Sequence, residues 1–303
     1  MKKKSPVLFG LAGALLLAAC GSGAGAKTTG TQVVASFYPF TFVAEQVGGT
    51  NVSVTNLTAP GVEPHDLELK PKQVGALQDA DLVIFENSFQ AAVDDAIGQA
   101  GRDSKDTIDV AGLVKLQPLP AGEGEAHGHA EGDPHVWLDP VNMIALTEAV
   151  RAKLSAIDPA HATNYTKNAT VLTAELKALD TSFSTGLAQC ATTKIVTSHA
   201  AFGYLAKRYG LEQIPIAGID PSNEPSLAQL AVITNLVRKD KITTIFTEEL
   251  VSPAIAETVA GATGAKTATL DPIEGLSDET AHENYLTLMA RNLSTIEKAN
   301  NCT

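Results

Sequence analysis

The chain has 303 residues, of which 44% are apolar and 18% charged, so it is long enough for two packed domains and too apolar for a fibrous or broadly disordered protein. Its 34 acidic residues outnumber 22 Lys and Arg, which gives a formal net charge of −12. This balance argues against a broad phosphate-binding surface, so nucleic acid is not expected as a partner. An acidic surface attracts cations, although many soluble proteins are acidic without binding one.

The first twenty residues have the organisation of a bacterial secretion signal. Three Lys precede an uncharged apolar stretch from Ser5 to Ala19, which is shorter than the roughly 20 residues that a membrane-spanning helix needs. The sequence LAAC at positions 17–20 resembles a lipobox, in which Cys20 is acylated and becomes the mature N-terminus. We therefore expect residues 1–19 to be a lipoprotein signal peptide.

Residues 20–30 are rich in Gly and poor in apolar side chains, which is typical of a flexible tether. A lipid on Cys20 would hold the protein to the membrane through this tether. The expected location is extracytoplasmic, at the cell surface or in the periplasm.

From residue 31 the chain alternates strand-like and helix-like segments. This alternation predicts parallel βαβ units and an α/β fold. In the first half the predicted segments are the strand QVVASFYPF, the helix TFVAEQVGG, the strand NVSVTNLT, the helix KPKQVGALQDA, the strand ADLVIFEN and the helix SFQAAVDDAIGQAG.

A Gly-rich and acid-rich segment at 120–133 cannot pack a core, so we expect it to be a surface loop. A helix then runs from Pro140 to about Ile157. No Pro or Gly follows Pro159 until Gly186, which predicts a second helix of roughly 40 Å. We assign 159–186 as a rigid linking helix between two lobes.

The βα pattern resumes after the linking helix. The expected organisation is an N-terminal α/β lobe at 31–158 and a C-terminal α/β lobe at 187–303, each with a parallel-type sheet. The second lobe is predicted from the segments KIVTSHAAFG, LAKRYG, IPIAGID, SLAQLAVITNLVRKD, ITTIFTEE, SPAIAETVAGATG and AKTATLD and the closing helix AHENYLTLMARNLSTIEKA.

Besides Cys20, the chain has two cysteines, Cys190 and Cys302. In an oxidising compartment a pair of cysteines is more often a disulfide than a metal or catalytic site, so we expect a Cys190–Cys302 bridge. The alternative is two unpaired buried thiols.

Three histidines lie where predicted strands or strand-edge loops end: His65 in GVEPHDLELKP, His135 in DPHVWLDP and His199 in VTSHAAFG. Ligands of open α/β sheets bind at the carboxyl ends of the strands. Singly, each histidine is explained as a turn, packed or helix-terminal residue. Together, three imidazoles supply most of a tetrahedral metal shell, and their wide spacing places the metal between the lobes.

The fourth ligand is expected to be a carboxylate. Asp271, in TATLDP, ends the last predicted strand and is the first choice, and Glu248, in IFTEEL, is the alternative. Glu63, Asp66 or Asp139 are candidates to orient the imidazoles from behind.

The loop at 120–133 contains His127 and His129 among four acidic residues. Such a tract can collect metal weakly, since ordering the loop costs backbone entropy. An auxiliary metal loop and a merely soluble loop are equally consistent with this composition. His161 and His282 lie on predicted helices in polar company and are interpreted as surface residues.

Four segments resemble, in order, the motifs of a known family: GVEPHDLELKP, DPHVWLDP, SHAAFGYLAKRYGL and TLDPIEGL. The family comprises the metal-binding solute-binding lipoproteins of bacterial ABC importers, the ZnuA and TroA-like group (cluster A-I). The resemblance covers the chain from about Val33 to its C-terminus. It implies two α/β lobes joined by one long helix, metal in the cleft between them, and delivery to an ABC permease by a monomer, with a metallochaperone as a further expected partner.

Manganese and iron members of that family carry a carboxylate at the third position, where this chain has His199. Three imidazoles and one carboxylate suit Zn²⁺ better than manganese, since nitrogen-rich tetrahedral sites favour the later metals. The expected function is a zinc-binding, non-enzymatic solute-binding protein of the zinc branch.

Three alternatives are a manganese-uptake protein of the same family, a secreted zinc hydrolase and a surface adhesin. A hydrolase would keep one metal position open for water, with Glu248 or Asp271 as general base. The chain lacks HExxH and GxSxG motifs, which disfavours the hydrolase. No segment of the sequence marks an exposed patch for adhesion.

Overall fold

The computed structural model describes residue 1 and the ranges 30–119 and 132–303. The predicted signal peptide, Cys20, and the loop histidines His127 and His129 lie outside these residues. Within the described ranges, no helix combines the length and the apolar character needed to cross a bilayer.

The first lobe is built on a four-stranded parallel sheet with the order β2-β1-β3-β4. Its strands are β1 (Thr31–Ala35), β2 (Val52–Asn56), β3 (Leu82–Phe85) and β4 (Thr107–Asp109). Parallel neighbours need crossover connections, which here include α1 (Tyr38–Gly48), α2 (Pro71–Asp79) and α3 (Ala91–Ala100). All four residues of β3 are buried, as expected for a strand covered on both faces.

The second lobe repeats this strand order as β6-β5-β7-β8, again with parallel pairs throughout. Its strands are β5 (Lys194–Thr197), β6 (Glu212–Pro215), β7 (Thr244–Thr247) and β8 (Lys266–Thr269). The connecting helices are α6 (Gly203–Tyr209), α7 (Leu227–Lys239) and α8 (Ala254–Thr263). The predicted α/β fold with two parallel-sheet lobes is confirmed.

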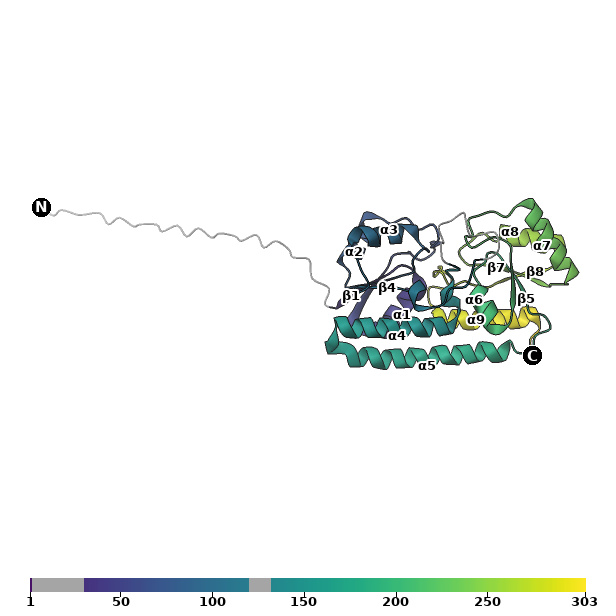
Figure 1. Cartoon of the computed structure of the whole chain (residues 1–303). Coiled ribbons are helices and arrows are strands. Elements are labelled where there is room, and N and C mark those ends of the chain that lie inside the picture. Colours follow the sequence, from purple (N-terminus) through teal and green to yellow (C-terminus); the bar gives the residue numbers. More distant parts are fainter. Residues whose placement is uncertain (2–29, 120–131) are drawn as a thin grey trace.

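Three long helices form a base beneath both lobes: α4 (Pro140–Ile157), α5 (Ala162–Gly186) and α9 (Tyr285–Asn300). Figure 1 shows α4 and α5 side by side, with α5 continuing from below the first lobe to the second. At 25 residues α5 is about 38 Å long, enough to underlie both lobes.

Helix α5 begins three residues later than the sequence pattern predicts. Residues Pro159–His161 form one 3-10 turn instead. The Asp158 carboxylate stabilises this turn, because it pairs with Nδ1 of His161 at 2.6 Å and accepts a hydrogen bond from the Tyr165 hydroxyl at 2.7 Å. The C-terminal end at Gly186 agrees with the prediction.

One hydrophobic core runs through both lobes and the base, and includes Ile84 of the first sheet, Leu172 of α5 and Ile195 of the second sheet. Two smaller cores cover the opposite faces of the sheets, one under α2 and α3 and the other under α7 and α8. Because the lobes share a core as well as a linking chain, free rotation of one lobe against the other would expose apolar surface.

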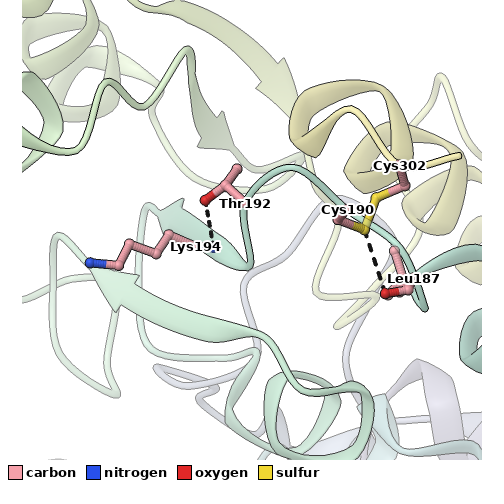
Figure 2. Close-up of a disulfide and its surroundings, with 5 residues drawn as sticks. All are labelled: Leu187, Cys190, Thr192, Lys194 and Cys302. Atoms are coloured by element: carbon pink, nitrogen blue, oxygen red, sulfur yellow. Dashed lines mark hydrogen bonds between the residues drawn. A yellow bond between two sulfur atoms is a disulfide. The ribbon is translucent and has the colours of Figure 1, made fainter.

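The predicted disulfide between Cys190 and Cys302 is present (Figure 2). It ties the segment before β5 to the residue after α9, across 112 residues of sequence. Backbone hydrogen bonds from Ala191 to Asn300 and from Thr303 to Gln189 flank it. The bridge therefore closes the whole second lobe at its C-terminal end.

Candidate metal centre

The three predicted histidines meet at the carboxyl ends of the strands, between the lobes. His65 lies in the loop after β2, His135 immediately precedes a 3-10 turn at Val136–Leu138, and His199 lies two residues after β5. A fourth side chain, Glu274, reaches the same point from the loop between β8 and α9. Each lobe thus supplies two of the four groups.

The four side chains converge on one point through single atoms. Oε1 of Glu274 lies 3.5 Å from Nε2 of His65, 3.5 Å from Nε2 of His135 and 3.4 Å from Nε2 of His199. The Nε2 atoms of His135 and His199 are 3.3 Å apart. Around a tetrahedral zinc with ligands at about 2.0–2.1 Å, neighbouring ligand atoms lie about 3.3–3.4 Å apart. Four of the six distances among the convergent atoms match that shell, and all six are within 4.8 Å.

The convergent atoms are withdrawn from solvent. The four side chains are between 0% and 3% exposed. Nε2 of His65 and Oε1 of Glu274 make no hydrogen bond to any described residue, although both are buried. Buried polar atoms without partners are costly, so the arrangement fits a group that binds an ion.

Two of the imidazoles are held from behind by carboxylates. Nδ1 of His135 pairs with Asp133 Oδ1 at 2.8 Å, and Nδ1 of His199 pairs with Glu248 Oε2 at 2.7 Å. The same carboxylates accept hydrogen bonds from the backbone amides of their histidines, at 3.0 and 3.1 Å. A carboxylate on Nδ1 keeps the proton there and leaves the Nε2 lone pair for a metal.

His65 is held differently. Glu63 accepts hydrogen bonds from the backbone amides of His65, at 3.1 Å, and Asp66, at 3.4 Å. Its carboxylate lies 4.0 Å from Nε2 of His65, beyond hydrogen-bonding distance. Glu63 therefore shapes the loop that carries His65 and does not orient the ring.

Neither of the remaining candidates, Asp66 and Asp139, forms a hydrogen bond or ion pair with an imidazole among the described residues. Asp139 caps α4 by accepting a hydrogen bond from the Val141 amide at 2.9 Å, and it lies 3.3 Å from Arg208. Asp133 and Glu248 take the expected orienting role. Asp133 was not considered, although it is two residues before His135 in DPHVWLDP, close enough to bond both its amide and its ring.

The charged and titratable side chains at this site shift one another's pKa values. Burial opposes ionisation of Glu274, but its interactions with the three nearby imidazoles outweigh burial and hold the pKa of Glu274 well below its ordinary value. Burial also disfavours protonated His199, yet nearby carboxylates raise its pKa well above the ordinary range. Burial lowers the pKa of His65, and burial together with the charge of Glu274 raises the pKa of Glu63 to about 8. A cation entering this group must therefore displace protons.

Asp271 lies outside the convergent group, contrary to the sequence-based expectation for the fourth position. Its Oδ1 accepts a hydrogen bond from the Ile273 amide at 2.7 Å, and its Oδ2 lies 3.3 Å from Nη2 of Arg291. Glu248, the alternative, lies against Nδ1 of His199, on the far side of that ring from Glu274.

Glu274 was missed because a strand-end rule favours the first acid after the strand. Asp271 follows β8 by two residues, whereas Glu274 follows it by five. Between them Ile273 adopts a left-handed backbone conformation, with φ of 58°, which a sequence pattern does not reveal for a β-branched residue. The available signal was that DPIEGL offers a second acid within the same motif.

Comparison with known proteins agrees with this geometry. The family model described as "Zinc-uptake complex component A periplasmic" (ZnuA) matches residues 33–299. The zinc-binding lipoprotein AdcA of Streptococcus pneumoniae is 40% identical over 98% of this chain and 61% of its own length. The high-affinity zinc uptake system protein ZnuA of Bacillus subtilis is 35% identical over 98% of both chains.

Among solved structures, the Zn(II)-bound ZnuA-like domain of Streptococcus pneumoniae AdcA superposes with a TM-score of 0.76 at 37% identity, covering 90% of this chain and 99% of that domain. The chain spans less than two thirds of the full-length streptococcal AdcA. The family match extends over nearly the whole of the described protein and includes all four convergent residues. The chain therefore belongs to the ZnuA family.

Proposed function

We propose that this protein is the extracytoplasmic zinc-binding component of an ABC importer, which captures Zn²⁺ and delivers it to a membrane permease. The observation that carries the proposal is the convergence of four buried ligand atoms: all lie within 4.8 Å of one another, and four of the six pairs are 3.3–3.5 Å apart, which suits one tetrahedral zinc. The zinc-binding names of the relatives support the same conclusion.

The proposed ligands are Nε2 of His65, His135 and His199 and Oε1 of Glu274. Three neutral imidazoles and one carboxylate carry a single negative charge, so a divalent ion leaves a net charge of about +1, which Asp133 and Glu248 offset from behind. Nitrogen-rich tetrahedral sites favour zinc over manganese, which prefers more oxygen ligands. This ligand chemistry supports zinc over the manganese alternative.

The same geometry disfavours the hydrolase alternative. A catalytic zinc uses three protein ligands and leaves a position for water, whereas here four protein atoms already fill a tetrahedral shell. The four side chains are also only 0–3% exposed, which disfavours access of a substrate to the ion. We therefore propose that the protein binds and releases zinc and catalyses no reaction.

The membrane attachment is proposed from the lipobox at Cys20, which would place the protein on the outer side of the cell membrane as a monomer beside its permease. Release to the permease requires that one ligand moves away or is protonated. His65 is the best candidate for that step, since none of the described residues places a carboxylate on Nδ1 of its ring.

The test is metal content after purification and dialysis against a weak chelator, measured by elemental mass spectrometry. We expect one zinc per chain in the wild type and none in the His135→Ala/His199→Ala variant. His161→Ala is the control, because His161 is half-exposed at the turn between α4 and α5. Retention of manganese in preference to zinc, or of no metal, would contradict the proposal.

A further inference from the structure

The loop that carries Glu274 contains an unfavourable backbone conformation. Ile273 has φ of 58°, in the left-handed region. This region costs a non-glycine residue roughly 1–2 kcal/mol, and β-branched residues are rare there. Something must hold this turn, since the turn directs the next side chain, Glu274, toward the three histidines.

Asp271 holds the turn directly. Its Oδ1 accepts a hydrogen bond from the Ile273 amide at 2.7 Å, and its side chain is only 2% exposed. Arg291 on α9 lies 3.3 Å from the other carboxylate oxygen. The carboxylate thus links the left-handed turn to the base helix.

The backbone of the same segment is clamped on both sides. The side chain of Asn292 accepts a hydrogen bond from the Asp271 amide at 2.9 Å and donates one to the Asp271 carbonyl at 2.6 Å. From the first lobe, the indole of Trp137 donates to the Pro272 carbonyl at 2.7 Å. With the two residues before Ile273 fixed, the orientation of Glu274 depends on the conformation of Ile273.

We infer that Asp271 is a positioning residue for zinc, which fixes the left-handed turn at Ile273 and so sets Oε1 of Glu274 at the distance that a tetrahedral ion requires. This inference rests on the proposed function. It assigns Asp271 a role through Glu274 and not as a ligand.

The test compares zinc affinity, by chelator competition, among variants of the full chain. Asp271→Ala is expected to lose about 10–100-fold in affinity with one zinc still bound, as supporting residues behind metal ligands do. Asp271→Asn retains an Oδ1 acceptor for the Ile273 amide, so its affinity is expected within about threefold of the wild type. A ligand carboxylate replaced by an amide would lose far more, so a loss in Asp271→Asn equal to that of Glu274→Gln would overturn the inference.

A matched control is Asp109→Ala in the first lobe. Asp109 makes the same kind of turn after β4, since its Oδ1 accepts a hydrogen bond from the amide of Ala111 two residues on. We expect that removing it leaves zinc affinity unchanged. Equal losses in Asp109→Ala and Asp271→Ala would show a general structural effect and overturn the inference.

A second substitution distinguishes a positioning role of Asp271 from a general effect on stability. Glycine adopts positive φ freely, so Ile273→Gly added to Asp271→Ala is expected to recover part of the lost affinity. In Co²⁺-loaded protein the visible absorption, strong for four-coordinate cobalt, is expected to fall in Asp271→Ala and to return in the double variant. No recovery in both readouts would overturn the inference. A wild type that binds no zinc, or an unchanged Glu274→Gln variant, would instead overturn the proposed function on which it rests.

Discussion

The two lobes share one strand order but differ in how completely their buried polar atoms are hydrogen-bonded. In the first lobe several buried polar atoms at the strand ends lack partners among the described residues, including both carboxylate oxygens of Glu86, Oε1 of Gln90 and Oγ of Ser36. At the corresponding edge of the second lobe, Thr197 donates to the His199 carbonyl at 2.7 Å and Glu248 bonds both the amide and the ring of the same histidine. The second lobe therefore presents a more completely bonded half of the site.

The difference extends to the ligands themselves. Of the proposed ligands, His199 is fixed by Glu248 and Glu274 by the clamped loop before it, whereas no carboxylate of the described residues lies behind the ring of His65. His135, the other ligand from the first lobe, is fixed by Asp133. The comparison indicates that three ligands are preorganised and that His65 completes the shell.

The largest expected effect on zinc affinity comes from removing a proposed ligand, either the preorganised His199 or His65. His199→Ala should reduce zinc affinity by more than the 10–100-fold typical of supporting residues, and by more than His65→Ala, because it removes a preorganised ligand. Isothermal titration with chelator competition measures both. A larger loss for His65→Ala would contradict the distinction between the three preorganised ligands and His65.

Removing the disulfide should weaken the second lobe. The Cys190→Ser/Cys302→Ser variant is expected to lose about 2–5 kcal/mol in free energy of unfolding, since the bridge closes a long loop in the unfolded chain. Urea denaturation measures the loss, and hydrogen exchange should locate it around β5 and α9. If neither the free energy of unfolding nor the zinc content changed, the disulfide would not contribute to the stability of the second lobe.

The carboxylates near the histidines should differ in how much they contribute to zinc affinity. Glu248→Gln is expected to reduce zinc affinity about 10–100-fold because it weakens the hold on Nδ1 of His199. Glu63→Gln should cost less than about tenfold, since Glu63 contacts backbone amides and not the ring of His65. Equal losses would mean that His65 is oriented as firmly as His199.

The smallest effect concerns Glu86 in the first lobe. Burial, assisted by the nearby charge of Asp133, raises the pKa of Glu86 well above its ordinary value. The folded protein therefore keeps a proton that the unfolded chain loses above about pH 4.3, so this group makes stability fall as pH rises toward its folded pKa.

Glu86→Gln has no such proton to lose. Its free energy of unfolding relative to the wild type should rise as the pH increases above about 4.3 and show no pH-dependent difference below about pH 4. Urea denaturation of the metal-free proteins at several pH values measures this. A difference that is constant with pH would contradict the assignment of Glu86 as a buried, protonated group.

Much of the fold could be predicted because it depends on short sequence patterns. The strand–helix alternation, the helix ending at Gly186 and the pairing of Cys190 with Cys302 each depend on short patterns or on a count of residues. The three histidines could be found because strand ends of parallel sheets converge on one edge. These features need no knowledge of side-chain contacts.

The rest depends on contacts that sequence patterns do not encode. Glu274 reaches the site because Ile273, the residue before it, adopts a left-handed backbone conformation. Side chains of α9, about twenty residues further along the chain, stabilise this loop through contacts with Asp271. Asp139, in the second histidine motif, caps α4 instead of orienting an imidazole. Asp133, at the start of the same motif, contacts the ring of His135. In both motifs the sequence pattern does not show which of two nearby acids faces the site.

We propose that one zinc is bound by three imidazoles and the Glu274 carboxylate in a tetrahedral shell. X-ray absorption at the zinc edge would measure this coordination. We expect four nitrogen or oxygen ligands at about 2.0–2.1 Å, with the scattering of three imidazole rings. A six-coordinate shell, or a wild-type spectrum that is unchanged in Glu274→Gln, would contradict it.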